Sequence, residues 1–450
     1  MSINSLSALN LNPPAIKPDG VSSSPAINVI AHIDATEPTV EAFLASRIDD
    51  FEKAKAESGD QLEVTARLHR AGSSAYRNIM DGVETLGFLV AAPLTGYILG
   101  GAAGFAAGGI LDAGMIALGV ARQGMQKIIS GREQGYLLKE SAWKGARTYY
   151  IEPDKTDGFD TKPTDIKPNE LKPGVKELGS FIGSGLKKYP SSTGILYLAG
   201  HGQGYKSIAS MPVTDLKKAI EIAADESGKK PDIILMESCL MGNMEALSEL
   251  RDSAKVAIVS EETIGAASLP LKDILNDAAK NGGTPEEIAG RIIEKTAETR
   301  FVDTLAAINL EKTGPFVEST GKLGDLLSGE IASGKKAEIR NAVKQAMKFP
   351  MGRMQFLDRM MTNFSDLGSF LKAIEKADLS QETKNAAMET YNKMQETIIL
   401  QAVKSKYGEA DGISFLAENT PRKDNAPGKG SYNELNIPSG WKNFINNLWK

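Results

Sequence analysis

Apolar residues recur with two different periods after residue 25, and the two periods alternate along the chain. The run 26–33 (AINVIAHI) is short, apolar and rich in β-branched residues, as buried strands are. Residues 40–51 then place apolar side chains at helical spacing, after Pro38 at a helix-start position. Residues 61–68 (QLEVTARL) alternate in the manner of a strand. A strand, a helix and a strand in this order predict a parallel sheet.

The segment 85–121 does not continue this alternation of strand and helix periods. Its only charged residue is Asp112, and its glycines at 96, 100, 104 and 108 fall on one helix face, which lets a second backbone approach closely. A single membrane span is excluded, because strands of one sheet are expected on both sides of the segment. A membrane hairpin with legs of roughly 18 residues, a re-entrant insertion and a soluble helical pair all remain open. Asp112 would be costly in lipid.

Two later apolar runs each end in a residue that can carry chemistry. The run 194–200 (GILYLAG) leads into His201, and the run 232–236 (DIILM) ends just before Cys239. A predicted helix over 212–224 joins them, so they are expected to be parallel neighbours. Ligands bind outside the carboxyl ends of such strands. Since adjacent strands lie about 4.8 Å apart, the imidazole and the thiol are expected within reach of each other.

An imidazole beside a thiol predicts nucleophilic catalysis. A thiol with a pKa of about 8.5 is mostly protonated at neutral pH, and its thiolate is the attacking species. The imidazole of His201 can take that proton and return it to a leaving amine. The backbone N–H groups of Gly202 and Cys239 are candidates for an oxyanion pocket. The alternatives are a small buried cysteine and a satisfied core histidine, and spacing names no third residue that would orient His201.

Composition narrows the remaining classes of function. The 450 residues are 41% apolar and 24% charged, as in soluble globular proteins. The net charge of −5 comes without a stripe of Lys or Arg, so nothing indicates nucleic-acid binding. One cysteine excludes an intramolecular disulfide, and three histidines argue against a His-rich metal site. The acidic loop 154–160 lacks the spacing and terminal Glu of a calcium loop, so a solvated turn is predicted there. No cofactor or metal is predicted.

The residues around His201 and Cys239 resemble clostripain-like cysteine peptidases of the caspase-like superfamily. The resemblance rests on a buried strand ending in His-Gly and on a later one ending in acid-x-Cys. Leu-Met-Gly and a Glu-bearing helix over 241–250 then follow. It extends to 26–70, to 148–151 and to the closing segment with 412–415 and 441–444. Nearly the whole chain after the leader is covered except roughly 71–143, and this stretch looks like an insertion between the second and third strands.

The fold class expected from this resemblance is α/β, with a caspase-like, mostly parallel sheet flanked by helices. The predicted organisation is a disordered leader over 1–25, a peptidase core over 26–70 and 144–314, a helical hydrophobic insertion over 71–143, and a mainly helical C-terminal part with closing strands over 315–450. The leader is not a Sec signal peptide, since no basic stretch precedes an apolar one. The expected location is the cytoplasm or export by another route, with membrane contact through 85–121 as an open alternative.

The resemblance also implies a substrate class: peptides cleaved after Arg or Lys through an acyl-enzyme. In the family, an Asp two residues before the nucleophile lines the pocket for that basic side chain. Glu237 holds this position here and keeps the negative charge with one more methylene. Glu261 and Glu262 are further candidates for substrate binding. A strand-end ion pair is the alternative role for Glu237.

Relatives are often activated by self-cleavage after a basic residue between the His and Cys strands. Lys217, Lys218, Lys229 and Lys230 are the available sites here. Calcium stimulation, known in some relatives, is neither supported nor excluded by this sequence. The main rival function is that of a membrane-associated effector or toxin that acts through the 85–121 hairpin on a peptidase-like carrier. A catalytically silent scaffold is a further alternative, because fold alone does not establish activity.

Overall fold

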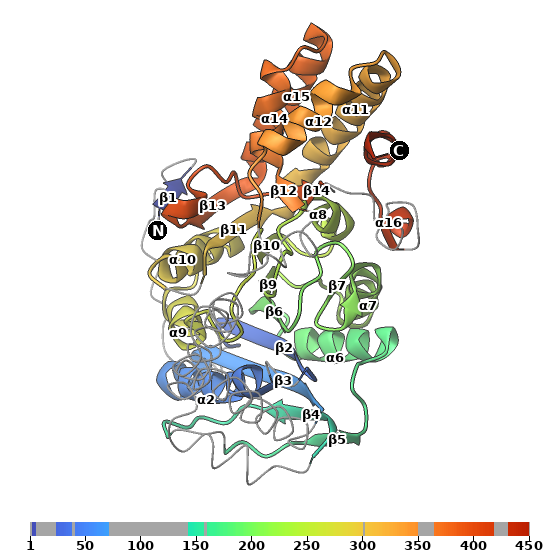
Figure 1. Cartoon of the computed structure of the whole chain (residues 1–450). Helices are drawn as coiled ribbons and strands as arrows, with labels where there is room; N and C mark the ends of the chain where they lie inside the picture. Colours follow the sequence, from blue (N-terminus) through green and yellow to red (C-terminus); the bar gives the residue numbers. More distant parts are fainter. Residues whose placement is uncertain are drawn as a thin grey trace, which may run out of the picture.

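A ten-stranded sheet forms the centre of the molecule (Figure 1). The computed structural model describes residues 2–5, 24–37, 41–71, 143–156, 160–299, 302–349, 364–417 and 431–449. The strand order is β1-β13-β11-β10-β9-β6-β2-β3-β4-β5. The five central strands are mutually parallel, and they are β10 (Val256–Val259), β9 (Ile233–Glu237), β6 (Thr193–Ala199), β2 (Ile27–Ala35) and β3 (Leu62–Arg70). The predicted α/β fold with a flanked central sheet is confirmed, with its parallel part in these five strands.

Helices cover both faces of the sheet, which explains why the central strands are apolar at nearly every position. On β9, Ile234 and Met236 enter the core on one face, and Ile233 and Leu235 enter the core on the other. The first face is covered by α6 (Val175–Lys188), α7 (Val213–Ser227) and α8 (Met244–Leu250). The second is covered by α1 (Glu41–Ala45), α2 (Arg47–Ser58), α9 (Leu271–Asn281) and α10 (Pro285–Ala297). Side chains therefore alternate between two separate cores.

The strand–helix–strand unit predicted at the start of the chain forms β2, α2 and β3. Strand β2 pairs in parallel with β3 on one side and with β6 on the other. Strand β6 pairs in parallel with β9, and the last pair in their register is Ala199 with Glu237. The predicted neighbourhood of the His and Cys strands is thus confirmed. Their carboxyl ends meet at one edge of the sheet, and the end of β2 lies beside them.

Antiparallel strands close the sheet on both sides. On one side are β4 (Gly145–Tyr150) and β5 (Asp165–Pro168), and on the other are β11 (Thr304–Asn309), β13 (Ile398–Val403) and β1 (Ser2–Ser5). Strand β4 contains residues 148–150 of the stretch 148–151 that the resemblance singled out. The part over 315–450 was predicted as mainly helical with closing strands, and within it the apolar strand β13 pairs with β11 in the central sheet. The leader differs at its start, because Ser2–Ser5 forms an edge strand through backbone pairing that polar side chains do not signal.

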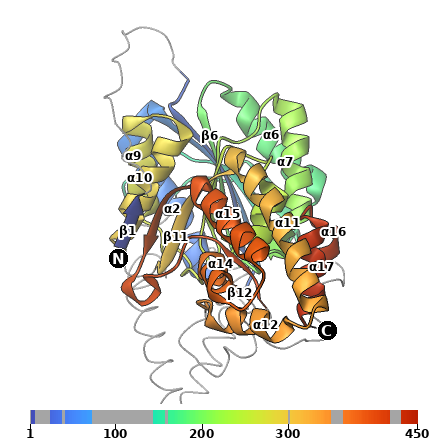
Figure 2. The same ribbon diagram turned by 90° about the horizontal axis from the view of Figure 1, so that it is seen from above.

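The C-terminal part is mainly helical and stands at one end of the sheet (Figures 1 and 2). Its helices are α11 (Thr313–Ala332), α12 (Lys336–Gln345), α14 (Leu367–Lys376), α15 (Gln381–Thr397), α16 (Ser431–Glu434) and α17 (Ser439–Leu448). The short strands β12 (Phe364–Asp366) and β14 (Ser414–Leu416) pair with each other beside them. Packed rings of Phe370, Phe415, Trp441 and Phe444 join α14, β14 and α17. This aromatic packing joins α14 and α17 to each other through β14.

Several predictions fall on residues that the structure does not describe. The hydrophobic segment 85–121 and nearly all of the insertion 71–143 lie outside the described residues. Among the helices that are described, none has the length and apolar character needed to cross a membrane.

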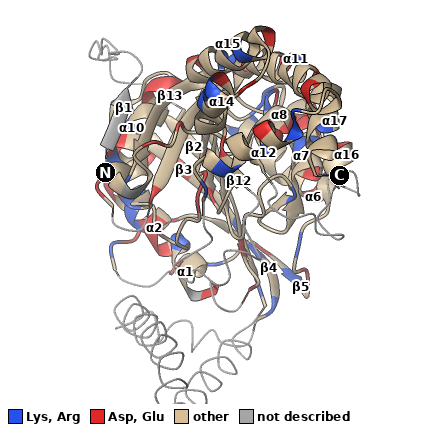
Figure 3. Cartoon of the chain, turned by 45° about the horizontal axis from the view of Figure 1, so that its top comes forward, with Lys and Arg blue, Asp and Glu red and all other residues tan. Residues whose placement is uncertain are grey.

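In the described part of the acidic loop, the Asp154 carboxylate accepts hydrogen bonds from the N–H and hydroxyl of Thr156, as in a local turn. Acidic and basic residues are interspersed over the described elements (Figure 3).

Candidate active site

The tips of β6 and β9 bring His201, Gly202 and Cys239 to one place. The Gly200 N–H lies 3.5 Å from the Glu237 carbonyl oxygen, at the last step of the paired strands. A Cβ atom on Gly202 would stand 2.0 Å from the carbonyl oxygen of Cys239 and 2.8 Å from its nitrogen. The two chain segments therefore touch through their backbones, and only glycine leaves room for that contact. The structure thus brings together the three residues that sequence spacing singled out for the reaction.

Cys239 is half-buried, and its thiol donates a hydrogen bond to the carbonyl oxygen of Ile264 at 3.5 Å. Burial raises the pKa of this thiol, and the charge of Glu262 raises it further. The resting form is therefore the neutral thiol. Within the described part of the chain, the thiol bonds to Ile264 rather than to His201. Catalytic hydrogen bonds in ligand-free enzymes often tighten only when substrate binds.

The segment after Cys239 is held on all sides by backbone hydrogen bonds. Leu240 has a φ of 61°, a left-handed conformation that is rare for a leucine, and its N–H donates to the Glu262 carbonyl at 3.1 Å. The Gly242 N–H donates to Ser260 at 2.8 Å. The Asn243 side chain then caps α8 by accepting the Ala246 N–H at 2.8 Å. Cys239 thus lies on a tightly fixed turn between β9 and α8.

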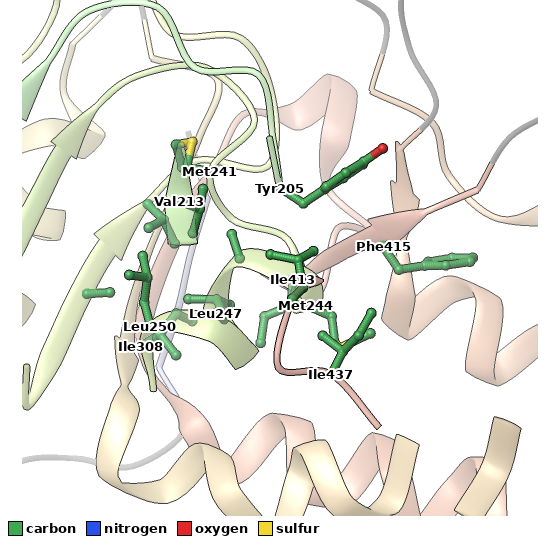
Figure 4. Packing of buried hydrophobic residues seen from close by; sticks show 14 of the residues in the cluster. Tyr205, Val213, Met241, Met244, Leu247, Leu250, Ile308, Ile413, Phe415 and Ile437 are labelled. Carbon is green, nitrogen blue, oxygen red and sulfur yellow. The ribbon is translucent and has the colours of Figure 1, made fainter. Parts of the chain in front are cut away.

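Helix α8 anchors that turn in the hydrophobic core (Figure 4). All seven residues of α8 are buried. Met244, Leu247 and Leu250 pack in the same cluster as Ile413 and Ile437 from the C-terminal part (Figure 4). Met236, Met241 and Met244 are buried beside the Cys239 turn and fill this core. The C-terminal part therefore contributes directly to the support of the Cys239 turn.

His201 is far more open, with 51% of its side chain exposed. Its Nε2 atom lies 3.5 Å from the Oε2 atom of Glu37, whose side chain is 41% exposed. Glu37 follows β2, the strand beside β6, so it reaches the same edge of the sheet. Sequence reasoning named no group to orient His201. The signal was present in Glu37, an acidic residue a few positions after the predicted strand 26–33, because parallel strands end at a common edge.

Glu237 is enclosed in a network of hydrogen bonds. Its carboxylate accepts from Nε of Arg47 at 2.9 Å, from Nη2 of Arg47 at 2.5 Å, from the Tyr197 hydroxyl and from the Leu269 N–H at 2.9 Å. The side chain of Glu237 is 0% exposed and that of Arg47 is 3% exposed. The structure therefore shows the strand-end ion pair that was the alternative role for Glu237. In this arrangement no oxygen of Glu237 is free for a substrate.

Glu261 and Glu262, the other two acidic candidates for substrate binding, are also buried. Glu261 accepts the Gly412 N–H at 3.1 Å, and burial together with Asp366 raises its pKa well above the usual range. Glu262 accepts from the Tyr407 hydroxyl and from the Thr263 N–H at 2.7 Å. Neither carboxylate is presented to solvent. Substrate binding by either of them stays a prediction that requires these contacts to open.

The four lysines predicted as self-cleavage sites lie in two settings. Lys217 and Lys218 are inside α7, so cleavage there requires the helix to unwind. Lys229 and Lys230 are in the loop between α7 and β9, at the opposite end of β9 from Cys239. The ammonium of Lys229 bonds to the Ser192 carbonyl at 2.9 Å, and that of Lys230 bonds to the Asp252 carbonyl at 2.6 Å. A cut after any of these lysines by the same molecule would need a large rearrangement.

A hollow of about 1060 Å³ lies elsewhere, between α2, α9 and α10. Its lining is mostly polar and acidic, and it includes Glu57, Asp273, Asp277 and Glu294. Neither Cys239 nor His201 borders it. Within the described ranges, no cluster of His, Cys, Asp and Glu is arranged to hold a metal ion. Among the described residues, the junction of β6 and β9 brings a thiol and an imidazole onto adjoining turns.

Comparison with known proteins agrees with this geometry. The sequence profile of the Clostripain family matches residues 169–420, more than half of the chain. None of the curated proteins compared with the chain matches it. Among solved structures, the chain is similar to an inactive zymogen C11 protease from Parabacteroides distasonis, with a TM-score of 0.57 at 11% identity over 96% of this chain and 100% of the other. It is also similar to a secreted C11 cysteine protease from Bacteroides thetaiotaomicron, solved with an irreversible peptide inhibitor.

For that second structure the TM-score is 0.54 at 11% identity, and the match covers 93% of this chain and 98% of the other. Identities this low support the fold alone, whereas the family profile supports membership. The match spans both His201 and Cys239, the residues that the structure brings into one junction. The protein therefore belongs to the clostripain family and is a cysteine-type peptidase with a caspase-like α/β fold.

Proposed function

We propose that the protein is an endopeptidase in which Cys239 is the nucleophile and His201 the general base. The observation that carries this proposal is the backbone contact between Gly202 and Cys239, with the Gly202 Cβ position 2.0 Å from the Cys239 oxygen. This contact holds the thiol and the imidazole on adjoining turns at the carboxyl edge of a parallel sheet, where substrates bind. The single cysteine of the chain leaves no second thiol for the role.

The reaction then proceeds in two steps. His201 takes the thiol proton, the thiolate of Cys239 attacks the peptide carbonyl, and the C–N bond breaks as His201 returns the proton to the leaving amine. A water, deprotonated by His201, then hydrolyses the thioester and releases the acid product. The N–H groups of Gly202 and Cys239, which belong to the same junction, are proposed to bind the oxyanion. Glu37, 3.5 Å from His201, would keep the ring oriented.

The proposed substrates are peptides with Arg or Lys before the cut. Support comes from the negative charge at Glu237, which stands two residues before the nucleophile. Arg47 already occupies this carboxylate in the described arrangement. A substrate guanidinium or ammonium would therefore bind Glu237 in place of Arg47, and α2 would have to shift. Reporter peptides that differ only in Arg, Lys, Gln or Glu before the scissile bond test this preference directly.

The central test compares the wild type with Cys239→Ala and His201→Ala on peptide reporters. We expect turnover by the wild type and loss of at least about 10³-fold in both variants, because nucleophile and base act as one unit. Iodoacetamide should abolish wild-type turnover and add one label, which mass spectrometry should locate at Cys239. Turnover that survives Cys239→Ala, or labelling without loss of activity, would contradict the proposal.

Self-activation is part of the proposal. It is supported by the resemblance of the chain to a protease solved as an inactive zymogen and by the neutral, buried thiol of the resting site. Lys229 and Lys230 lie in a loop, so a second molecule could bind the backbone there in an extended form, whereas cleavage after Lys217 or Lys218 requires α7 to unwind. Wild-type protein should show a nick in the 228–232 region that Cys239→Ala lacks. The same banding pattern for both proteins would rule out self-cleavage.

A further inference from the structure

The hairpin that follows His201 contains two successive residues in the left-handed region. Ala209 has a φ of 47° and Ser210 a φ of 61°, in the hairpin formed by β7 (Ser207–Ile208) and β8 (Met211–Pro212). Neither residue is a glycine, so this conformation is unfavourable for both unless the surroundings impose it. Such conformations are concentrated at functional sites, where other contacts hold them in place. The contacts that hold this pair therefore matter for the site.

Backbone hydrogen bonds connect the left-handed pair to His201. The Ala209 N–H donates to the His201 carbonyl at 2.9 Å, and the Gln203 N–H donates to the Ser207 carbonyl at 2.9 Å. Gly202 forms an isolated bridge with Ile208. A Cβ on Gly200 would lie 3.0 Å from the Cα of Ala209, so the corner is also closely packed. The position of the His201 backbone is thus coupled to the conformation at 209–210.

Strand β2 supplies the side chains that hold this pair. The Ser210 hydroxyl donates to Oδ2 of Asp34, while Oδ1 of Asp34 accepts from the N–H and the hydroxyl of Thr36 at 3.1 and 2.6 Å. Nε2 of His32 lies 3.3 Å from the Ala209 carbonyl, so it must carry the donated proton. Asp34 and His32 are both buried. Burial lowers the pKa of His32, so its ring remains a neutral donor at neutral pH.

We infer that Asp34 and His32 are positioning residues for the peptidase reaction. They hold Ala209 and Ser210 in the left-handed conformation and thereby fix His201 against Cys239. This inference rests on the proposed role of His201 and goes beyond it, since neither residue touches the reacting atoms. It assigns a task to buried polar groups at the end of β2 that the chemical steps do not use. It also explains why a serine follows Ala209 in a conformation where glycine would be easier.

Ser210→Ala and Asp34→Ala remove the same hydrogen bond from opposite ends. We expect each to lower kcat about 10- to 100-fold with KM within about threefold, because a shift of about 1 Å at a catalytic group is enough for such a loss. The double variant should be no worse than Asp34→Ala alone. Adding Ser210→Gly to Asp34→Ala should restore part of kcat, since glycine adopts a positive φ without help.

Ser192→Ala is the matched control. The buried Ser192 hydroxyl donates to the Pro25 carbonyl at the opposite end of β6, so its loss is chemically similar but remote from His201. It should leave kcat within about twofold of the wild type, while its unfolding midpoint falls at least as far as in Ser210→Ala, because Ser192 is buried and Ser210 is exposed. An unchanged kcat in both Ser210→Ala and Asp34→Ala would overturn the inference. A failure of Ser210→Gly to restore any kcat in the Asp34→Ala background would also overturn it.

A second measurement separates this inference from the proposed function. Hydrogen exchange at the Ala209 amide, which is bonded to the His201 carbonyl, should speed up at least about tenfold in Asp34→Ala and Ser210→Ala but not in Ser192→Ala. If the wild type shows no turnover that depends on Cys239, the proposed function fails and the exchange rates decide the structural part alone. Unchanged exchange in both variants contradicts the inference whatever the activity.

Discussion

The two halves of the site are built in opposite ways. Cys239 lies on a turn enclosed by the loop after β10 and by buried α8, and its thiol points to a backbone carbonyl. His201 is half exposed, and its support is a short strained corner together with side chains from the end of β2. Extensive packing holds Cys239, whereas only a few hydrogen bonds hold the exposed His201. His201 is therefore the half of the site that can move when substrate binds.

The largest effect on stability is expected from the ion pair between Arg47 and Glu237, at the end of β9. Arg47→Met leaves the buried carboxylate of Glu237 without its cation, which should cost about 3–5 kcal/mol of unfolding free energy. Urea unfolding measures this loss. The double variant with Glu237→Gln should recover much of it, because no charge is then left buried. A single variant as stable as the wild type would mean that the Arg47–Glu237 pair is not buried in solution.

The next largest effect is expected at the backbone contact between Gly202 and Cys239, where the two halves of the site meet. Gly202→Ala puts a Cβ atom 2.0 Å from the Cys239 oxygen, so the two turns must separate. We expect kcat/KM on peptide reporters to fall about 10²-fold, since a displacement of about 1 Å is enough. Gly290→Ala is the control, because a Cβ there meets nothing within 4 Å. Equal activity of the two variants would mean that the contact between Gly202 and Cys239 is not needed for the reaction.

The free energy of unfolding is expected to depend on pH through His69, a buried histidine on β3. Burial lowers the pKa of His69 to about 3, whereas an unfolded histidine titrates near 6.5. Below about pH 6.5 the unfolded state binds a proton that the folded state does not, so the stability from His69 is present above that pH and lost between 6.5 and 3. At pH 5 the loss is about 2 kcal/mol.

The measurement is the free energy of unfolding of the wild type and of His69→Asn at pH 8 and pH 5. The difference between the two proteins should change by about 2 kcal/mol between these pH values, while other titrating groups cancel. Asparagine can still donate to the Glu170 carbonyl that His69 Nδ1 contacts at 3.3 Å. A pH-independent difference would contradict the neutral state of buried His69.

The smallest effect is expected at Glu37, because both it and His201 are largely exposed. Glu37→Gln should lower kcat less than tenfold and leave KM within about twofold, since water screens the interaction. Glu37→Asp should restore part of the loss. Glu57→Gln is a matched control, because Glu57 is similarly exposed and bonds to Lys272 at 2.9 Å far from the site. No difference between the two Gln variants would remove Glu37 from the mechanism.

Some features of the fold could be read from residue patterns alone. The apolar runs 194–200 and 232–236, each followed by a reactive residue, predicted β6 and β9 and their shared edge. The alternation near the start predicted the parallel β2–β3 pair. Strand β13 was missed because its six residues follow directly on α15 and resemble the end of a helix. Strand β1 was missed because its side chains are polar, and an edge strand needs only backbone bonds.

In the candidate site, too, some residues could be identified from the sequence while the roles of others could not. His201, Gly202 and Cys239 could be named because each follows a strand with a recognisable pattern. The role of Glu237 could not be decided, because its cation, Arg47, is 190 residues away in the chain. Likewise, the burial of Glu261 depends on Gly412 and Asp366, which lie in the C-terminal part. The charge of a residue is visible in a sequence, but the partner that neutralises it is not.

By itself, the sequence determined the strand tips and the residues that they carry, because hydrophobic period and residue type are local properties. Only the tertiary structure decided that Arg47 neutralises Glu237, that Glu37 lies beside His201 and that β2 holds the corner at Ala209 and Ser210. These contacts join segments that are close in space and far apart in the chain. They form because the sheet places the ends of β2, β6 and β9 side by side, an arrangement fixed by the packing of both cores.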